Sequence, residues 1–231
     1  MRIAGPILMV IGSFTIATIA YGVLIAAGLS SKSAEAVAQA VGGLGILGLG
    51  FRSYSRLPGH ERRQVLAPKR SIGACVGVGV GLAFVLRLVA AVLISIGQRV
   101  DPSLCRQLTT LEDANPKVLW HKVVLAVSLV VLAPFGEELV FRGLLLRGLV
   151  RRMTFPAAAV ISGVAFALLH PQYWTIWPLL IAIAIFGIVA AYLYRGLGYP
   201  ANVTMHVMFN LVTTIFLFSD FGIDQSSPTC K

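Results

Sequence analysis

The chain alternates between long apolar runs and short polar segments. About seven of these runs approach the roughly 20 apolar residues that an α-helix needs to cross a bilayer. We therefore predict an all-α fold, a polytopic membrane bundle of about seven transmembrane helices, with residues 1–231 forming a single membrane domain. The predicted helices are residues 5–31, 34–51, 71–97, 118–150, 155–170, 174–194 and 201–218.

Two polar segments set the predicted orientation in the membrane. Residues 52–70 are the most basic part of the chain, and residues 98–117 form the one long polar loop. Lys and Arg in short loops favour the cytoplasmic side, so we expect a cytoplasmic N-terminus, a basic cytoplasmic loop at 52–70 and a non-cytoplasmic loop at 98–117. This orientation puts Cys105 and Cys230 together on the non-cytoplasmic side. The sequence leaves open whether they are bridged, and two free thiols are favoured.

The composition supports a membrane protein and argues against a soluble basic domain. Of the residues, 57% are hydrophobic and 12% are charged, whereas soluble domains carry about 25% charged residues. A net charge of +10 would suit nucleic acid on a soluble domain, but here the basic residues lie between membrane helices. Orientation in the membrane explains them there. We therefore expect a lipid bilayer as a partner and no nucleic acid.

In the stretch 134–143, two carboxylates and an arginine interrupt an apolar run. Charges inside a membrane helix are costly and usually pair with one another or take part in chemistry. On a helix Glu138 and Arg142 share a face, whereas Glu137 points about 100° away. We therefore interpret Glu138–Arg142 as a structural pair and Glu137 as the reactive carboxylate, with a purely structural ion pair as the alternative. Pro134 is expected to bend the helix just before them.

Two histidines and an asparagine lie in other apolar helices. His170 ends one predicted helix, and His206 and Asn210 project from one face of another. Buried polar groups need partners, which these side chains and Glu137 can supply to one another. Helical rise puts Glu137 and His170 at one depth, about 21 Å from the same face, but His206 only about 9 Å from it. His206 reaches the others only if the preceding turn dips inward or the helices tilt.

Other residues carry weaker signals. His60 in the basic loop and His121 near a helix end are expected to be solvated surface groups. Arg87 lies deep in the third run, where it pairs with an acid or extends along the helix towards the interface. The glycine-rich run 34–51 predicts close approach of helix backbones.

Three motifs in this chain resemble those of a known family. The chain carries, in order and on separate predicted helices, Glu137-Glu138-x-x-x-Arg142 followed by Gly143, then Phe166-x-x-x-His170, then His206-x-x-x-Asn210. This pattern is similar to the CPBP family, also called Abi, of type II CAAX prenyl endopeptidases and bacteriocin-processing or immunity proteins. The motifs lie within residues 132–210, and the first hundred residues carry no family signature.

The resemblance implies a membrane-embedded endopeptidase. By this resemblance Glu137 and His170 activate a water that attacks a peptide carbonyl, while His206 and Asn210 bind the resulting oxyanion. A carboxylate base together with His and Asn donors is suited to this chemistry. The resemblance gives a supporting role to Glu138, Arg142 and Phe166.

The cofactor is left open between two mechanisms. Glu137, His170 and His206 are also suitable as three ligands of a Zn²⁺ ion with water as the fourth. The family resemblance fits a metal-dependent and a glutamate-dependent protease equally. The sequence lacks H-E-x-x-H, so it does not establish a metal.

Two other functions compete with proteolysis. A non-catalytic binding or immunity protein of the same fold is the main alternative, although no motif position is substituted. A transporter is disfavoured because the halves show no inverted repeat. We expect a protein or peptide substrate at the membrane, which could be a prenylated protein, a bacteriocin leader or a membrane peptide. The resemblance implies the plasma (inner) membrane of a prokaryote, and the sequence does not give the oligomeric state.

Overall fold

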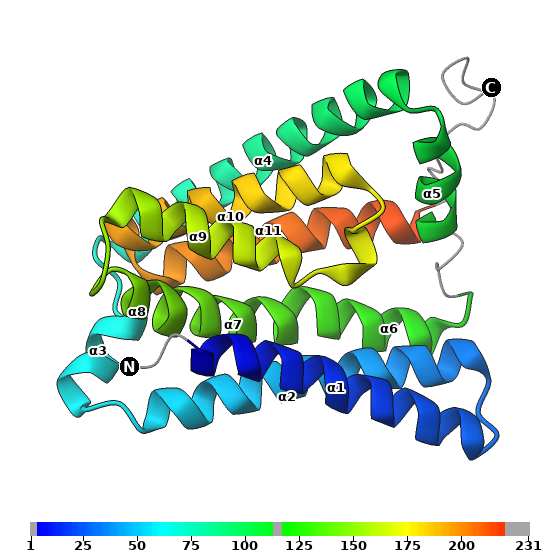
Figure 1. Cartoon of the computed structure of the whole chain (residues 1–231), viewed down its shortest axis with the longest axis horizontal. Coiled ribbons are helices and arrows are strands. Elements are labelled where there is room, and N and C mark those ends of the chain that lie inside the picture. The colour runs from blue at the N-terminus through cyan, green and yellow to red at the C-terminus, as the bar shows by residue number, and fades with distance from the viewer. Residues whose placement is uncertain (1–3, 113–116, 220–231) are drawn as a thin grey trace.

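The computed structural model describes residues 4–112 and 117–219, and its long helices lie side by side along one direction (Figure 1). The first two helices, α1 (Ala4–Ala26) and α2 (Ser31–Ser55), form a hairpin along one side of the bundle. On the opposite side runs α4 (Ile72–Val100). The other helices outside the central run are α3 (Gly59–Leu66), α5 (Ser103–Glu112), α9 (Phe155–Leu168), the 3₁₀ turn η3 (Pro171–Tyr173), α10 (Trp177–Leu197) and α11 (Tyr199–Phe218).

The outside of the bundle is apolar, as a bilayer requires. Large exposed side chains include Leu8, Val23, Leu88, Val92 and Phe216, whereas a soluble protein rarely exposes extended apolar surface. Within the described residues, six helices are long and apolar enough to cross a membrane, and α9 is a shorter apolar helix of 14 residues. The prediction of an all-α, multi-pass membrane bundle is confirmed, whereas the predicted number of about seven crossings is not established.

The predicted helix 118–150 is one continuous helical run whose geometry changes along its length. It consists of α6 (Leu119–Val127), the π-helical turn η1 (Ser128–Leu132), α7 (Ala133–Glu138), the π-helical η2 (Leu139–Leu146) and α8 (Arg147–Leu149). Pro134 has no N–H, and in a regular α-helix its ring clashes with the carbonyl four residues earlier. The wider π turn directly before α7 accommodates this proline within the helical run. π turns of this kind are frequent at functional sites.

Several polar segments differ from what the sequence predicted. The expected loop at 98–117 contains α5, because Leu104 and Leu108 pack against Ile176. The expected loop at 52–70 contains α3. His121 is not solvated: only 5% of it is exposed, and its ring lies 3.1 Å from the Ser33 hydroxyl. His60 is exposed as expected. Cys105 is buried on α5 and is disulfide-bonded, so the favoured prediction of a free thiol there is wrong, and Cys230 lies outside the described residues.

Glycines let helices approach closely at two places that shape the interior. In α2, Gly43 faces Leu132, at a distance where an added Cβ would lie 2.9 Å from that side chain. This contact agrees with the close packing predicted for 34–51. Between α9 and α10, a Cβ on Gly163 would come within 2.7 Å of the Ile188 backbone nitrogen, and Gly187 lies directly opposite. Both contacts therefore bring helix backbones together around the central run.

Candidate active site

The three motifs meet inside the bundle around Glu137. Its carboxylate oxygen Oε2 lies 3.9 Å from Nε2 of His170 and 3.8 Å from Nε2 of His206. The same oxygen is buried and has no hydrogen-bond partner within the described protein. Both nitrogen distances exceed the usual hydrogen-bond length, which leaves room for a bridging water. Polar groups therefore surround Oε2 of Glu137, but none of them lies close enough to form a direct hydrogen bond with it.

Glu138 has the opposite environment. Its side chain is 0% exposed and accepts hydrogen bonds from Arg142 Nη1 at 3.1 Å and from Asn202 Nδ2 at 2.8 Å. Its Oε1 also lies 2.9 Å from Nδ1 of His206. A buried charge persists only when it is paired and hydrogen-bonded, and Glu138 meets both conditions. This geometry agrees with the interpretation of Glu138–Arg142 as a structural pair.

The hydrogen bonds around the two imidazoles assign their protons. His170 Nδ1 lies 2.6 Å from the backbone carbonyl of Phe166, and a carbonyl can only accept, so Nδ1 donates. Glu138 accepts from Arg142 as an ionised carboxylate, so His206 Nδ1 donates to it as well. In both rings Nε2 is then the nitrogen left to face Glu137. The site thus presents two imidazole nitrogens to one carboxylate oxygen.

Arg142 and Phe166 hold the helices together beneath these groups. Arg142 Nη2 donates to the Gly187 carbonyl of α10 at 3.1 Å. Its guanidinium lies 4.7 Å from the centre of the Phe166 ring, which in turn lies 4.7 Å from the His170 ring. Such cation–π contacts gain strength when they are desolvated. Arg142 therefore links the central run to α9 and α10, the helix pair joined by the glycine contact.

Asn210 bonds to a backbone carbonyl that the π turn leaves without its usual helical donor. The Ala133 N–H bonds to the Ser128 carbonyl, so it does not take its regular α-helical acceptor, the Leu129 carbonyl. One residue further on, Pro134 has no N–H to offer. Asn210 Nδ2 donates to this Leu129 carbonyl at 2.8 Å. An amide nitrogen carries two hydrogens, so one N–H of Asn210 is left for another acceptor.

The depth mismatch expected for His206 is resolved at the start of α11. Gly198 has a φ of 89°, which favours glycine, and it sits against the 67–69 backbone through a bridge to Pro68. The next residue, Tyr199, donates its hydroxyl proton to the Phe135 carbonyl at 2.8 Å. Because Phe135 is two residues before Glu137, α11 already begins close to the level of the site. The turn before α11 therefore lies deep enough for His206 to reach Glu137.

A cavity of about 540 Å³ contains the converging groups. Its lining includes Glu137, His170, His206 and Asn210, while the exposed side chains of Lys32 and Gln39 in α2 lie at its rim. The exposed rim indicates that the cavity reaches the surface at the start of α2.

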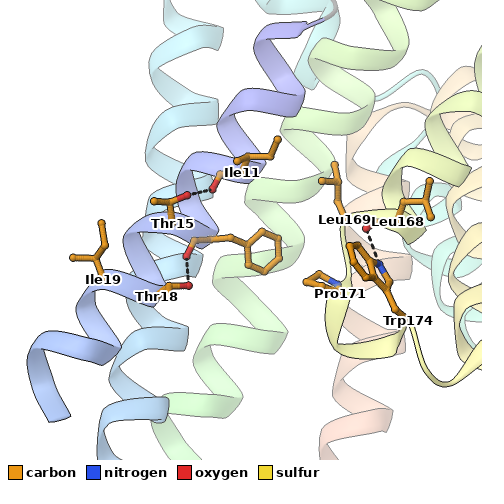
Figure 2. Close-up of a pocket in the computed structure, with 9 residues that line it drawn as sticks. Ile11, Thr15, Thr18, Ile19, Leu168, Leu169, Pro171 and Trp174 are labelled. Atoms are coloured by element: carbon orange, nitrogen blue, oxygen red, sulfur yellow. Dashed lines mark hydrogen bonds between the residues drawn. The ribbon is translucent and has the colours of Figure 1, made fainter.

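A second hollow, of about 390 Å³, lies between α1 and the end of α9 (Figure 2). Ile11, Thr15 and Trp174 are among its lining residues, and no ionisable side chain lines it. Phe14 and Leu169 line both hollows, so the two are neighbours. The reactive groups belong to the larger cavity alone.

The sequence proposed Glu137, His170 and His206 as ligands of a Zn²⁺ ion. In the part of the chain that the structure describes, no group of three or more His, Cys, Asp or Glu side chains is arranged to hold a metal ion. The two imidazole nitrogens approach the same carboxylate oxygen. This geometry suits a hydrogen-bonded water.

Sequence reasoning missed some members of the site. Asn202 was not considered, although it precedes His206 by four residues and therefore shares its helix face. Tyr173, whose ring stacks 6.3 Å from that of His170, was not predicted as a member of the site. The signal for Asn202 was present as a repeat of polar residues at four-residue spacing in α11. Tyr173 had no comparable signal.

Arg87 follows neither of its two predicted alternatives. No described carboxylate pairs with it. Its Nη1 donates to the Thr213 hydroxyl at 3.0 Å, and its guanidinium lies 5.1 Å from the centre of the Phe209 ring. It also lines the large cavity.

Comparison with known proteins supports the resemblance carried by the three motifs. Residues 119–212 match the family described as "Type II CAAX prenyl endopeptidase Rce1-like". No curated protein and no solved structure matches the chain significantly. The match includes all three motifs and excludes α1 to α5. Over residues 119–212 the chain is thus similar to the Rce1-like type II CAAX prenyl endopeptidases, and its six long apolar helices among the described residues make it a multi-pass membrane protein.

Proposed function

We propose that this protein hydrolyses a peptide bond at the membrane by attack of a water that Glu137 and His170 activate. The observation that carries the proposal is the unsatisfied oxygen of Glu137, which faces two imidazole nitrogens in a cavity. An unpaired carboxylate inside a membrane protein is costly and marks a functional site by default. The match of residues 119–212 to an endopeptidase family supports the reaction type.

The distances suit a water between Glu137 and His170. A water held there would donate one hydrogen to Glu137 Oε2 and the other to His170 Nε2, because both accept. Its oxygen lone pair would then face the cavity. As the water oxygen bonds to the peptide carbonyl carbon, its proton passes to Glu137. That proton is later delivered to the leaving amine as the carbon–nitrogen bond breaks.

The oxyanion formed on the carbonyl needs donors on the other side of the substrate. Asn210 has one N–H that is not committed to Leu129. His206 presents Nε2 to the same part of the cavity and would donate from it whenever that nitrogen carries a hydrogen. Preorganised donors of this kind contribute a factor of about 10²–10³ in kcat each. Glu138 therefore acts through His206 as a positioning residue in this scheme.

The experiment uses the purified full-length protein in lipid or detergent. A library of membrane-anchored reporter peptides is offered to the wild type and to Glu137→Gln, with and without a metal chelator. We expect cleavage by the wild type, a loss of about 10²–10⁴-fold in Glu137→Gln, and no effect of the chelator. Loss of activity with chelator and recovery with Zn²⁺ would replace this scheme by the metal-dependent one. Binding of peptides without any cleavage would instead favour the non-catalytic alternative.

A further inference from the structure

The large cavity opens at one end of the bundle. The side chains of Lys32, Glu35 and Gln39 line it and are exposed, and all three lie in the first turns of α2. The turn between α1 and α2 and the short helix α5 lie at this same end, whereas α3 and α8 lie at the other (Figure 1). We call the end at which α2 begins the mouth end and the opposite one the α3 end.

Glu137 lies deep inside the cavity from the mouth end. There α2 and the central run begin together, and an added Cβ on Gly43 would lie 2.9 Å from Leu132. Gln39 precedes Gly43 by four residues and Glu137 follows Leu132 by five, so about 14 Å of helical rise separates the rim from the reactive carboxylate. A cavity of about 540 Å³ is too small for a folded domain. A peptide bond therefore reaches Glu137 only within a flexible, extended segment.

The other end of the bundle is closed. Beyond Glu137, every residue of Leu139–Leu146 is buried. The helix α3 covers this part of the run, because a Cβ on Gly143 would lie 2.9 Å from the fully buried Val65. The Tyr194 hydroxyl donates to the Val65 carbonyl at 3.1 Å and ties α3 to α10. The lining of the cavity includes no residue of α3 or α8. Among the described residues, the mouth end is therefore the open route to Glu137.

Lys and Arg are concentrated at the closed end. Residues 52–70 carry six of them, and Arg147, Arg151, Arg152 and Arg195 lie at or near the helix ends there. The described Lys and Arg of the mouth end are fewer: Lys32, Arg99, Arg106, Lys117 and Lys122. Short basic loops stay on the cytoplasmic side, so this distribution favours a cytoplasmic α3 end. The comparison uses the places of the residues in the fold and does not depend on the number of membrane crossings.

The cysteines support the same orientation independently of charge. Cys105 lies on α5 at the mouth end and is disulfide-bonded. Cys75, near the start of α4 at the α3 end, is a free thiol that lies 3.4 Å from the Leu197 carbonyl. Disulfides persist in oxidising compartments and are rare in the cytosol. A disulfide at the mouth end and a free thiol at the α3 end thus fit a mouth that faces the non-cytoplasmic side.

We propose that the active-site cavity opens to the non-cytoplasmic side of the membrane, and that the substrate is an extended polypeptide segment exposed on that side. A chain that stays in the cytoplasm would meet the closed α3 end and would not reach Glu137. The substrate class is therefore a translocated segment, either of an exported chain or of the outer flank of a membrane protein. This inference rests on the proposed function, because it assigns the substrate of the same site.

Cysteine labelling tests the side without any need for cleavage. Gln39→Cys places a thiol at the mouth, and Gln64→Cys, at an exposed position of α3, is the matched control at the other end. A membrane-impermeant maleimide is applied, without reductant, to intact cells that produce the full-length protein. We expect labelling above the wild-type level for Gln39→Cys, and for Gln64→Cys only after the membrane is permeabilised. Labelling of Gln64→Cys in intact cells, or no labelling of Gln39→Cys, would overturn the inference.

Oriented membrane vesicles test the side on which the substrate is cleaved. The probe is a charged, membrane-impermeant reporter peptide that the purified wild type cleaves, and vesicles with Glu137→Gln give the background. We expect cleavage by right-side-out vesicles, loss of cleavage in inverted vesicles, and equal cleavage by both after detergent is added. Cleavage by inverted vesicles before detergent would overturn the inference and leave the proposed function intact. Failure of the purified wild type to cleave any peptide of the library would contradict the proposed function, and the labelling result would still decide the side.

Discussion

Glu137 and Glu138 are neighbours in the chain, yet they occupy different environments. Glu138 is fully buried and its oxygens contact Arg142, Asn202 and His206. Glu137 is partly accessible from the cavity, and its Oε2 has no hydrogen-bond partner. A saturated carboxylate is held in place and stays ionised, whereas an unsaturated one is available to take a proton from water. We therefore infer that Glu138 stabilises the fold and that Glu137 takes part in the reaction.

The largest expected effect on stability comes from Glu138→Gln. Removing one partner of a buried ion pair leaves an uncompensated charge, here Arg142, and costs about 3–5 kcal/mol. We expect a large fall in the melting temperature of the purified protein, measured by thermal unfolding in one detergent. Glu138→Gln combined with Arg142→Gln should recover part of this loss, because no unpaired charge is left. An unchanged melting temperature in the single variant would remove the structural assignment of Glu138.

The two histidines sharpen the comparison, because only His206 contacts both carboxylates. His206→Gln loses a hydrogen bond to the charged Glu138, worth about 1.5–3 kcal/mol of stability. His170→Gln loses a hydrogen bond to a neutral carbonyl, worth about 1 kcal/mol. We expect both variants to be strongly impaired in peptide cleavage, with His206→Gln clearly less stable in thermal unfolding. Equal stability of the two variants would contradict the bridging role of His206.

Asn210 tests whether one side chain serves both structure and chemistry. Asn210→Ala leaves the buried carbonyl of Leu129 without a donor, at a cost of about 1–3 kcal/mol. If its second N–H also binds the oxyanion, kcat should fall by about 10²–10³-fold. Unfolding and kcat measured on the same preparation separate the two roles. A destabilised variant with unchanged kcat would restrict Asn210 to supporting the π turn.

The smallest effect on stability is expected for Glu61, a surface carboxylate that pairs with arginine. It serves as a control for the buried pair of Glu138 and Arg142. A hydrogen bond from Arg151, with the charges of Arg151 and Arg147, holds the pKa of Glu61 below its ordinary value. A lowered folded-state pKa gives stabilisation above the ordinary pKa, and this is lost as the pH falls through the folded pKa. Glu61→Gln should therefore differ slightly in stability from wild type near neutral pH, and this difference should shrink as the pH falls through the lowered pKa of Glu61. A large loss of stability or activity in this variant would contradict the account.

The all-α membrane fold and the family resemblance could be predicted because they depend on local patterns. Apolar runs of bilayer length indicate membrane helices regardless of how these pack. The four-residue spacings within 137–142, 166–170 and 206–210 indicate shared helix faces. The match over 119–212 confirms the family that these spacings indicated.

The sequence could not predict features that depend on the packing of separate helices. No pattern in the run 118–150 predicts π turns. The Leu129 carbonyl, which lacks its helical donor, and its hydrogen bond from Asn210 were therefore not predicted. The depth of α11 is set by Gly198 against the 67–69 backbone, a contact between distant segments. His121 was expected at the surface because its partner, Ser33, is remote in sequence. Each of these contacts joins residues far apart along the chain.

The most direct test of the central claim measures Glu137→Gln and Glu138→Gln side by side, each for peptide cleavage and for thermal unfolding in the same detergent. We expect Glu137→Gln to keep the melting temperature of the wild type and to lose about 10²–10⁴-fold in kcat. We expect Glu138→Gln to lower the melting temperature, with any fall in activity following from the loss of fold and of His206 positioning. An unfolded Glu137→Gln together with a stable, inactive Glu138→Gln would reverse the two assignments and contradict the account.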